Sequence, residues 1–283
     1  MDELFTRVLH EDSEHGRWEL VLGRPDRRLR AFVHGYQGYD ETAAPAPVLR
    51  QEVPSVSVPL IVNFGARWRI ADSVSGTGDR RDSFVAGLHE RSTFVAAEGA
   101  AQCIQVDFTP IGAHLFFGIP MHELSNRVVD VEDVLARDRN LVERLEDARS
   151  WHARFALLDA VISARLAAAR RPAPDIVWAW RALVHTNGAV RVSALAEKVG
   201  RSRRHLNCGF REHIGVGPKT AARIVRFSRA VDLLGRRRIP LVELAQECAY
   251  FDQAHMTREF REFAGTTPSE FASRLIPGGG VLA

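Results

Sequence analysis

Cysteine is scarce in this sequence, and its three copies form no recognisable pattern. Cys103, Cys208 and Cys248 lie far apart, with no CxxC pair and no histidine at metal-ligand spacing. This distribution argues against a disulfide framework and against a structural zinc site. We therefore expect no bound metal and no other cofactor.

Long apolar runs are missing as well. No run approaches the roughly 18 residues that a membrane-spanning helix needs. The start of the chain, Met1 to Leu4, lacks the basic and then apolar build of a signal peptide. We expect a cytoplasmic protein that has no membrane partner.

The residue sets that catalytic β-barrels use are also absent. His34, His89, His114 and His122 are isolated, and no two histidines one residue apart precede a carboxylate. Isolated histidines are poor candidates for a metal centre, which needs three or four converging ligands. The sequence predicts no catalytic residues and no metal site, so we do not expect an enzyme.

The whole chain has a net charge of +3, and its positive charge is concentrated in the C-terminal part. Residues 175–283 carry 17 Lys and Arg against 10 Asp and Glu, a net +7. Residues 1–174 carry 21 against 25, a net −4. Such a concentration is the electrostatic footprint of a polyanion binder. A length of 283 residues with 46% apolar residues suits two globular domains.

Turn residues recur about every ten residues between 16 and 110, which is typical of an all-β barrel or sandwich. In the last β-rich run Ile104, Val106 and Phe108 alternate with Gln105 and Asp107, so the two sets should face opposite sides of a strand. The expected strands are Trp18–Leu22, Leu29–Gly35, Val56–Phe64, Arg67–Ala71, Phe84–Leu88, Thr93–Ala97 and Gln102–Phe108.

Helical periodicity replaces the β pattern after Gly112. The longest run predicts a helix over 150–169, and we expect its single apolar stripe to pack on the β domain or on a partner helix. The stripe consists of Trp151, Phe155, Leu158, Ile162 and Leu166. Residues 171–174 then read as a short linker. Shorter helices are expected at Ala113–Phe117, His122–Ser125, Val131–Ala136 and Arg139–Ala148.

One helical pattern occurs twice between Val192 and Phe271, about fifty residues apart. Each copy predicts a short helix, a tight turn and a second helix, which together make a helix-turn-helix. Ser202 and Asp252 precede the second helices and have side chains preferred at a helix N-cap. A helix over Lys219–Leu234 would join the two motifs, and it could set the second helices about 34 Å, one DNA turn, apart.

The second helix of each motif leaves polar side chains outside, of types that hydrogen-bond base edges and phosphates. We expect DNA contacts from Ser202, Arg203, Arg204, Asn207 and Arg211, and from Gln253, His255, Thr257, Arg258 and Arg261. The candidates for base edges among them are Arg204, Asn207, Gln253, His255 and Arg258. The run Arg236 to Arg238 either contacts phosphate or complements the negative end of the joining helix.

The second motif resembles the signature of the AraC/XylS transcription regulators. The resemblance covers about the last hundred residues and rests on Ile239–Ala245, Phe251–Gln253, Met256–Arg261 and Gly265–Pro268. It implies an all-α DNA-binding domain over 175–276, with helix-turn-helix motifs at 192–213 and 241–263. The first motif departs from the family pattern, because Cys208 stands where an Arg is usual and Gly209 follows where a large residue is usual. Cys208 is either a redox-sensitive thiol or an ordinary tolerated residue.

The first part of the chain is similar to the cupin-like sensor domains that precede this DNA-binding domain in many family members. The resemblance implies a cupin-like β-barrel with helices over 1–170, which binds an effector, dimerises or does both. Residues 277–283 remain as a flexible tail. Effector-binding residues are not identified by any motif.

We therefore predict a multidomain α and β protein that acts as a sequence-specific DNA-binding transcription regulator, modulated by a small-molecule effector at its N-terminal domain. The implied partners are double-stranded DNA, an effector, a second copy of the chain and, for an activator, RNA polymerase. Two alternatives remain open at this point. One is a sequence-neutral, architectural DNA-binding protein, and the other is a cupin-type enzyme fused to a DNA-binding domain.

Overall fold

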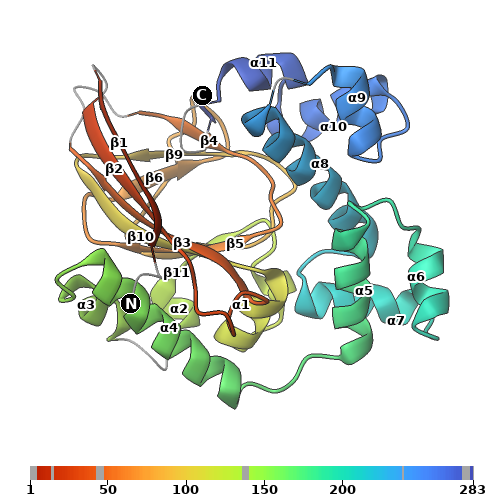
Figure 1. Cartoon of the computed structure of the whole chain (residues 1–283), viewed down its shortest axis with the longest axis horizontal. Coiled ribbons are helices and arrows are strands. Elements are labelled where there is room, and N and C mark those ends of the chain that lie inside the picture. Colours follow the sequence, from red (N-terminus) through yellow and green to blue (C-terminus); the bar gives the residue numbers. More distant parts are fainter. Residues whose placement is uncertain are drawn as a thin grey trace.

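The computed structural model describes residues 5–13, 16–42, 48–135, 140–237, 239–275 and 281–282. A β-rich domain with helices comes first, an all-α domain follows, and the two lie side by side (Figure 1). The expected order of domain types is confirmed. None of the described helices is long and apolar enough to cross a membrane.

The larger sheet has the strand order β1-β2-β3-β10-β5-β8-β11, and its neighbours are antiparallel. Along β10, Ile104, Val106 and Phe108 are fully buried on one face, and Gln105 and Asp107 alternate with them as predicted. The strands are β1 (Phe5–Ser13), β2 (Gly16–Gly23), β3 (Val33–Glu41), β5 (Val58–Asn63), β8 (Phe84–Ala86), β10 (Ala101–Phe108) and β11 (Val128–Asp130).

The smaller sheet has the order β12-β4-β9-β6-β7. An apolar cluster contains Ile61 and Cys103 of the larger sheet together with Trp68 and Ile70 of the smaller one, so the two sheets face each other. The strands are β4 (Arg50–Glu52), β6 (Trp68–Ala71), β7 (Asp79–Arg81), β9 (Thr93–Ala97) and β12 (Val281–Leu282).

The predicted β-barrel is wrong in one respect, because the strands do not close into a barrel. Among the described residues the strands form two separate sheets, with no hydrogen-bonded strand pair between them. Three of the four edge strands, β7, β11 and β12, are only two or three residues long. Such short edges offer few backbone groups for pairing, so they end a sheet rather than extend it.

Strand β3 begins later and runs further than the expected Leu29–Gly35. The Asp26 side chain accepts a hydrogen bond from the Arg28 amide at 2.8 Å, and the Leu29 amide donates to the Asp26 carbonyl at 2.8 Å. These bonds fold residues 26–32 into turns, because an Asp side chain that binds the backbone two residues on mimics a turn. The sequence patterns also missed β1, β4, β7, β11 and β12.

Helix α4 covers the outer face of the larger sheet, as its stripe predicted (Figure 1). The Phe155 ring stacks on Tyr36 with centroids 5.4 Å apart. A Cβ on Gly38 would lie 2.4 Å from the Trp151 ring, so the sheet accommodates this ring only at a residue without a side chain. The fully buried members of the stripe are Phe155, Leu158 and Ile162.

The other helices of the first domain are short. The expected ends at Ala136 and Arg139 lie outside the described residues. The observed elements are α1 (Pro110–Phe117), the 3-10 helix η1 (Met121–Glu123), α2 (Val131–Val134), α3 (Leu141–Glu146) and α4 (Trp151–Ala168).

The C-terminal domain consists of seven described helices, and α8 runs between the two motifs (Figure 1). Its 19 residues make a rod of about 28 Å at 1.5 Å per residue. The helices are α5 (Pro174–His185), α6 (Val192–Lys198), α7 (Arg203–His213), α8 (Pro218–Arg236), α9 (Leu241–Glu247), α10 (Gln253–Ala264) and α11 (Pro268–Ser273).

The N-terminal domain binds the end of α10. The Gln51 side-chain amide on β4 donates to the Ala264 carbonyl at 2.7 Å and to the Ser92 hydroxyl at 2.8 Å. The Ser92 hydroxyl donates in turn to the Phe263 carbonyl at 2.8 Å. Carbonyls in the last turn of a helix lack intrahelical partners, so the first domain caps this helix. Residues 281 and 282, which we expected in a flexible tail, form β12 and pair with β4.

A second contact between the domains holds α7. The ring of His213 lies 4.5 Å from the ring of His114, which belongs to α1. His213 Nε2 accepts from the Ala173 amide at 3.2 Å, and its Nδ1 contacts the Gly209 carbonyl at 3.1 Å. Burial and the neighbouring His114 lower the pKa of His213, which matches a neutral ring that accepts at one nitrogen and donates at the other.

Candidate nucleic-acid interface

The first motif has the predicted form. Helices α6 and α7 are joined by a turn in which Gly200 has φ of +64°, a left-handed conformation that favours glycine. The Ser202 hydroxyl accepts from the His205 amide at 3.2 Å, so the expected N-cap is confirmed. Leu206 and Phe210 are fully buried and anchor the inner side of α7.

The second motif repeats this geometry with α9 and α10. Ala249 has φ of +57° at the position of the turn that Gly200 holds in the first motif. The Asp252 carboxylate accepts from the His255 amide at 2.6 Å, which confirms the second N-cap. Met256 and Phe260 are fully buried and fix the inner side of α10.

Most of the predicted DNA-contacting side chains lie on the outer faces of α7 and α10. In the first motif all five are exposed. In the second, four line one shallow surface depression that runs along α10 over three turns, namely Gln253, Thr257, Arg258 and Arg261. The Thr257 hydroxyl is already held by the Gln253 carbonyl at 2.9 Å.

His255 is placed apart from this group. Its ring is half-buried and lies edge-on to Tyr250, with centroids 5.3 Å apart. Its Nε2 lies 3.8 Å from the buried Glu259 carboxylate. The structure therefore directs part of this side chain toward the domain interior, unlike Gln253 and Arg258.

The cations of the two outer faces are free, whereas many others in the domain are paired. Among the described residues, no carboxylate or hydrogen-bond acceptor contacts Arg203, Arg204, Arg211, Arg258 or Arg261. By contrast, Arg201, Arg223, Arg226, Arg229, Arg236 and Arg237 each contact an Asp or Glu. Unpaired guanidinium groups keep all their donors available for phosphates and base edges.

The triple-arginine run is less available than the sequence indicates. Arg236 Nε binds Asp232 at 2.6 Å, and Arg237 pairs with Glu247. Arg238 lies outside the described residues. Arg236 thus pairs within α8, and Arg237 pairs with an acid of α9. Contact of the run with phosphate stays a prediction.

Two arginines of α8 fix its position against α10, and the sequence patterns missed this role. Glu259 is 4% exposed, and its Oε1 accepts from Arg223 Nε at 2.9 Å and from Arg226 Nη2 at 3.3 Å. Arg226 Nη1 also donates to the Gly188 carbonyl at 3.0 Å. The available signal was Arg226 itself, a charged residue within the apolar stripe of a helix. A buried carboxylate held by two cations favours one packing of α8 on α10.

The departures of the first motif have a structural basis at Gly209. A Cβ at this position would lie 2.3 Å from Cδ1 and 2.6 Å from Cγ1 of Ile176, a residue of α5 that is 1% exposed. Helix α5 thus packs directly on the backbone of α7, which leaves no room for the large residue that the family pattern has. Cys208 beside it is exposed and has no disulfide partner.

We expect Gly209→Ala to lower the free energy of unfolding by about 1 to 2 kcal/mol. The overpacking against Ile176 costs roughly 1–3 kcal/mol, while alanine regains up to about 1 kcal/mol of helix propensity. The measurement is urea unfolding of the full chain. Gly235→Ala is the matched control, because a Cβ there meets no atom within 4 Å. Stabilisation by Gly209→Ala equal to that of the control would show that α5 does not press on α7.

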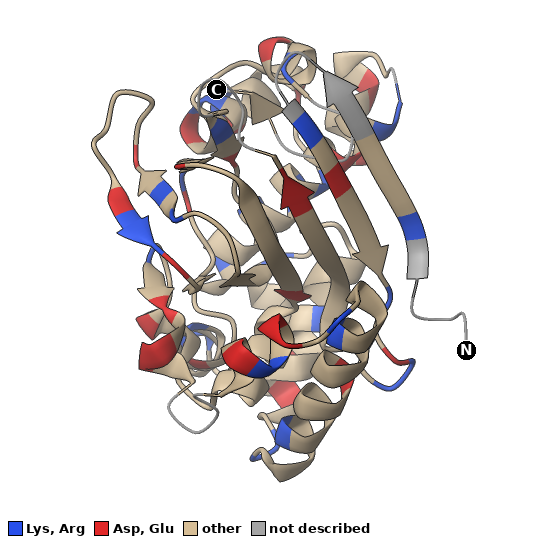
Figure 2. Cartoon of the chain, turned by 90° about the vertical axis from the view of Figure 1, so that its left-hand side faces the viewer, with Lys and Arg blue, Asp and Glu red and all other residues tan. Residues whose placement is uncertain are grey.

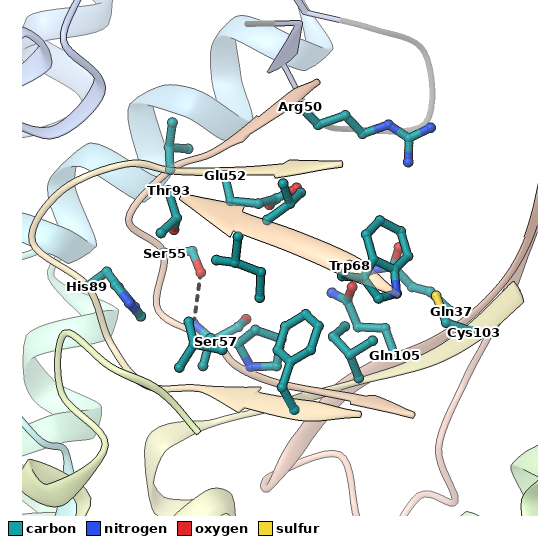
Figure 3. Close-up of a pocket in the computed structure, with 18 of the residues that line it drawn as sticks. Gln37, Arg50, Glu52, Ser55, Ser57, Trp68, His89, Thr93, Cys103 and Gln105 are labelled. Carbon is teal, nitrogen blue, oxygen red and sulfur yellow. Dashed lines mark hydrogen bonds between the residues drawn. The ribbon is translucent and has the colours of Figure 1, made fainter. Parts of the chain in front are cut away.

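A second candidate site lies between the two sheets of the N-terminal domain. It is a cavity of about 340 Å³. The aromatic residues Trp18, Tyr39, Trp68 and Phe84 line it. The polar residues Gln37, Glu52 and Gln105 line it as well (Figure 3). No sequence motif identified it, since its residues come from strands that are far apart in the chain. Its only sequence signal was the polar face of β10.

The isolated histidines do not form a metal centre. His89 lines the cavity, where burial lowers its pKa and its Nδ1 contacts the Gly87 carbonyl at 2.7 Å. His114 lies at the domain contact described above, and His122 is in η1. Within the described residues, no group of three or more His, Cys, Asp and Glu side chains could hold a metal ion.

Comparison with known proteins identifies two regions of the chain. Residues 195–274 match a family described as a helix-turn-helix domain, and residues 23–130 match a domain of unknown function, DUF6597. The F1 operon positive regulatory protein of Yersinia pestis is 35% identical over 88 residues, which are 31% of this chain and 29% of that protein. The match thus spans less than a third of the length of this relative.

Among solved structures, ToxT from Vibrio cholerae has 9% sequence identity and a TM-score of 0.49 over 84% of this chain and 97% of ToxT. The C-terminal domain of AraT from Geobacillus stearothermophilus has 20% identity and a TM-score of 0.36 over 38% of this chain and 93% of that one. Scores below 0.5 do not establish a common overall fold. The duplicated capped motifs and the family match agree that residues 195–274 form a helix-turn-helix domain, and this part of the chain is similar to a positive regulatory protein.

Proposed function

We propose that the protein is a sequence-specific regulator that reads two successive major-groove segments with α7 and α10. Arg204, Asn207, Gln253 and Arg258 would contact base edges, with His255 in a secondary role. Ser202, Arg203, Arg211, Thr257 and Arg261 would set position on the phosphates. The observation that carries the proposal is the set of exposed, unpaired arginines on both helices, in a domain where many other arginines are paired.

Each of the domains proposed from the sequence would have its own role in such a regulator. Residues 1–170 would form a cupin-like sensor and dimerisation domain, 171–174 a linker and 175–276 the DNA-binding domain. The cavity between the sheets is the proposed effector site, since most of its lining residues lie within 23–130 and its wall holds aromatic and polar side chains. A regulator of this kind would work in the cytoplasm as a homodimer, with RNA polymerase as a further partner if it activates.

A direct link between this cavity and the second motif supports regulation. Glu52 lines the cavity, and the preceding residue, Gln51, holds the Ala264 carbonyl at the end of α10. Successive residues of a strand point to opposite faces, so one short strand serves both sites. A ligand that moves β4 would therefore change the cap on α10 and its freedom to turn toward DNA.

Binding of the full-length chain to a selected site and to a scrambled duplex tests sequence specificity. We expect the selected site to bind at least about 1,000-fold more tightly, within the usual range for specific regulators. For both duplexes the affinity should fall steeply as salt rises, since cations released from phosphates drive the common part of binding. Equal affinities across the salt series would favour a sequence-neutral, architectural protein instead.

A further inference from the structure

The polar groups of the N-terminal cavity present mainly hydrogen-bond acceptors to its interior. The Nε2 atoms of Gln37 and Gln105 donate to the two carboxylate oxygens of Asp107, at 2.8 and 2.7 Å. This orientation holds both amide groups by their NH₂ ends and leaves their carbonyl oxygens as acceptors. The hydroxyl groups of Ser55 and Thr93, which also line the cavity, can accept as well.

Glu52 is a carboxylate in the cavity wall that has no hydrogen-bond or ion-pair partner among the described residues. Its side chain points into the cavity from the smaller sheet, while Gln105 does so from the larger one (Figure 3). Among the described residues no side chain or amide forms a hydrogen bond or ion pair with its oxygens. The side chain is accessible to water, yet burial raises the pKa of Glu52. Both observations hold because Glu52 lines a cavity that water enters and that protein atoms surround on several sides.

Among the described residues, neither arginine of the cavity wall forms an ion pair with Glu52. Arg50 favours the ionised form of Glu52, whereas Asp107 opposes it. Arg50 is itself engaged, because its Nη2 contacts the Tyr39 hydroxyl and Glu41 Oε2, the latter at 3.2 Å. Its Nε is covered by protein and out of reach of a ligand. Arg91, the other cation in the wall, is exposed to solvent.

The apolar part of the wall suits a cation that has an organic body. Trp18, Trp68 and Phe84 line the cavity, and an aromatic face attracts a cation within about 6 Å of its centre. A volume of about 340 Å³ lies at the small end of ligand pockets, which range over roughly 300–1,000 Å³. It fits a molecule with a single ring or a short branched chain.

We propose that the effector is a small organic ammonium compound, whose charged group binds the Glu52 carboxylate and the Gln37 and Gln105 carbonyl oxygens and whose apolar part packs among the aromatic side chains. This assignment deepens the proposed effector site and rests on the proposed regulatory function. A carboxylate ligand would instead meet the Glu52 carboxylate, and it would find the NH₂ groups of Gln37 and Gln105 already bound to Asp107. A neutral ligand would form no ion pair with Glu52.

The test uses three probes of nearly equal shape on the full chain without DNA. They are 2-phenylethylamine, 2-phenylethanol and 3-phenylpropionate, titrated by calorimetry and by tryptophan fluorescence, to which Trp18 and Trp68 of the cavity wall contribute. We expect saturable binding of the amine, with the alcohol weaker by at least tenfold and no binding of the carboxylate. Glu52→Gln should weaken amine binding by about tenfold to hundredfold, because a charge-assisted hydrogen bond is lost. Glu132→Gln is the matched control, since Glu132 is exposed on α2 and outside the cavity wall.

Three results would overturn the assignment. They are binding of the carboxylate or the alcohol at least as tight as that of the amine, no saturable amine binding, and equal amine affinity in Glu52→Gln and the wild type. DNA binding is measured separately on the same preparations. If amine binding depends on Glu52 but the protein binds no specific DNA site, the proposed ligand class is supported and the proposed regulatory function is contradicted. If the protein binds a specific DNA site but no amine, the regulatory function is supported and the ligand class is contradicted.

Discussion

Replacement of Leu158 by Asp is expected to unfold the N-terminal domain. Leu158 is fully buried in the middle of α4, between Phe155 and Ile162, which are also fully buried. Loss of the leucine side chain costs about 2–5 kcal/mol, and an unpaired carboxylate in the core adds several kcal/mol more. The total approaches the whole stability of a typical domain, about 5–15 kcal/mol. Circular dichroism and urea unfolding of the full chain measure it.

The control for this change is Ala160→Asp, two residues further along the same helix. Ala160 is exposed, so its replacement introduces the same charge without burying it. We expect a loss below about 1 kcal/mol, mainly from helix propensity. If Leu158→Asp gave a folded monomer from a dimeric wild type, the stripe would belong to a subunit interface. Unchanged stability and unchanged mass would contradict the packing of α4 on the sheet.

Loss of Arg258 should weaken specific DNA binding far more than loss of the thiol of Cys208. The guanidinium group of Arg258 is exposed and unpaired, and a bidentate contact to guanine contributes about 1–3 kcal/mol of discrimination. Arg258→Ala should therefore lower affinity for the selected site by about fivefold to a hundredfold. Cys208→Ala should change it less than twofold, because a thiol cannot make that contact.

Both variants are compared at one salt concentration, together with Cys208→Arg. Cys208 is exposed on the outer side of α7, so an arginine fits there without disturbing the contact of Gly209 with Ile176. We expect Cys208→Arg to tighten binding and to change the preferred bases of the first half-site. A larger loss from Cys208→Ala than from Arg258→Ala would reverse this order and indicate a special role for the thiol.

Features encoded in short windows of sequence were predictable. The caps of Ser202 and Asp252, the buried pair Met256 and Phe260 and the stripe of α4 all follow from local periodicity and capping chemistry. The outer faces of α7 and α10 follow as the complement of their inner faces. For the same reason, most of the proposed DNA-contacting residues are where the sequence placed them.

Features that depend on distant segments were not predictable. The pairing of β12 with β4 joins residues more than two hundred positions apart, and so does the bond from Gln51 to Ala264. Glu52 lies in a three-residue strand that carries too few residues for an alternating pattern. His255 was placed by its spacing on the helix, whereas Tyr250 and Glu259 decide where its ring lies.

Selection of bound fragments from a random DNA library shows whether both helix-turn-helix motifs read DNA. We propose that α7 and α10, joined by the rod of α8, read two successive major-groove segments. The full-length chain should therefore enrich a motif with two blocks of preferred bases whose centres lie about one helical turn, roughly 10 base pairs, apart. Arg258→Ala should blur one block only. Enrichment of a single block, two blocks at variable spacing, or no sequence at all would contradict the account.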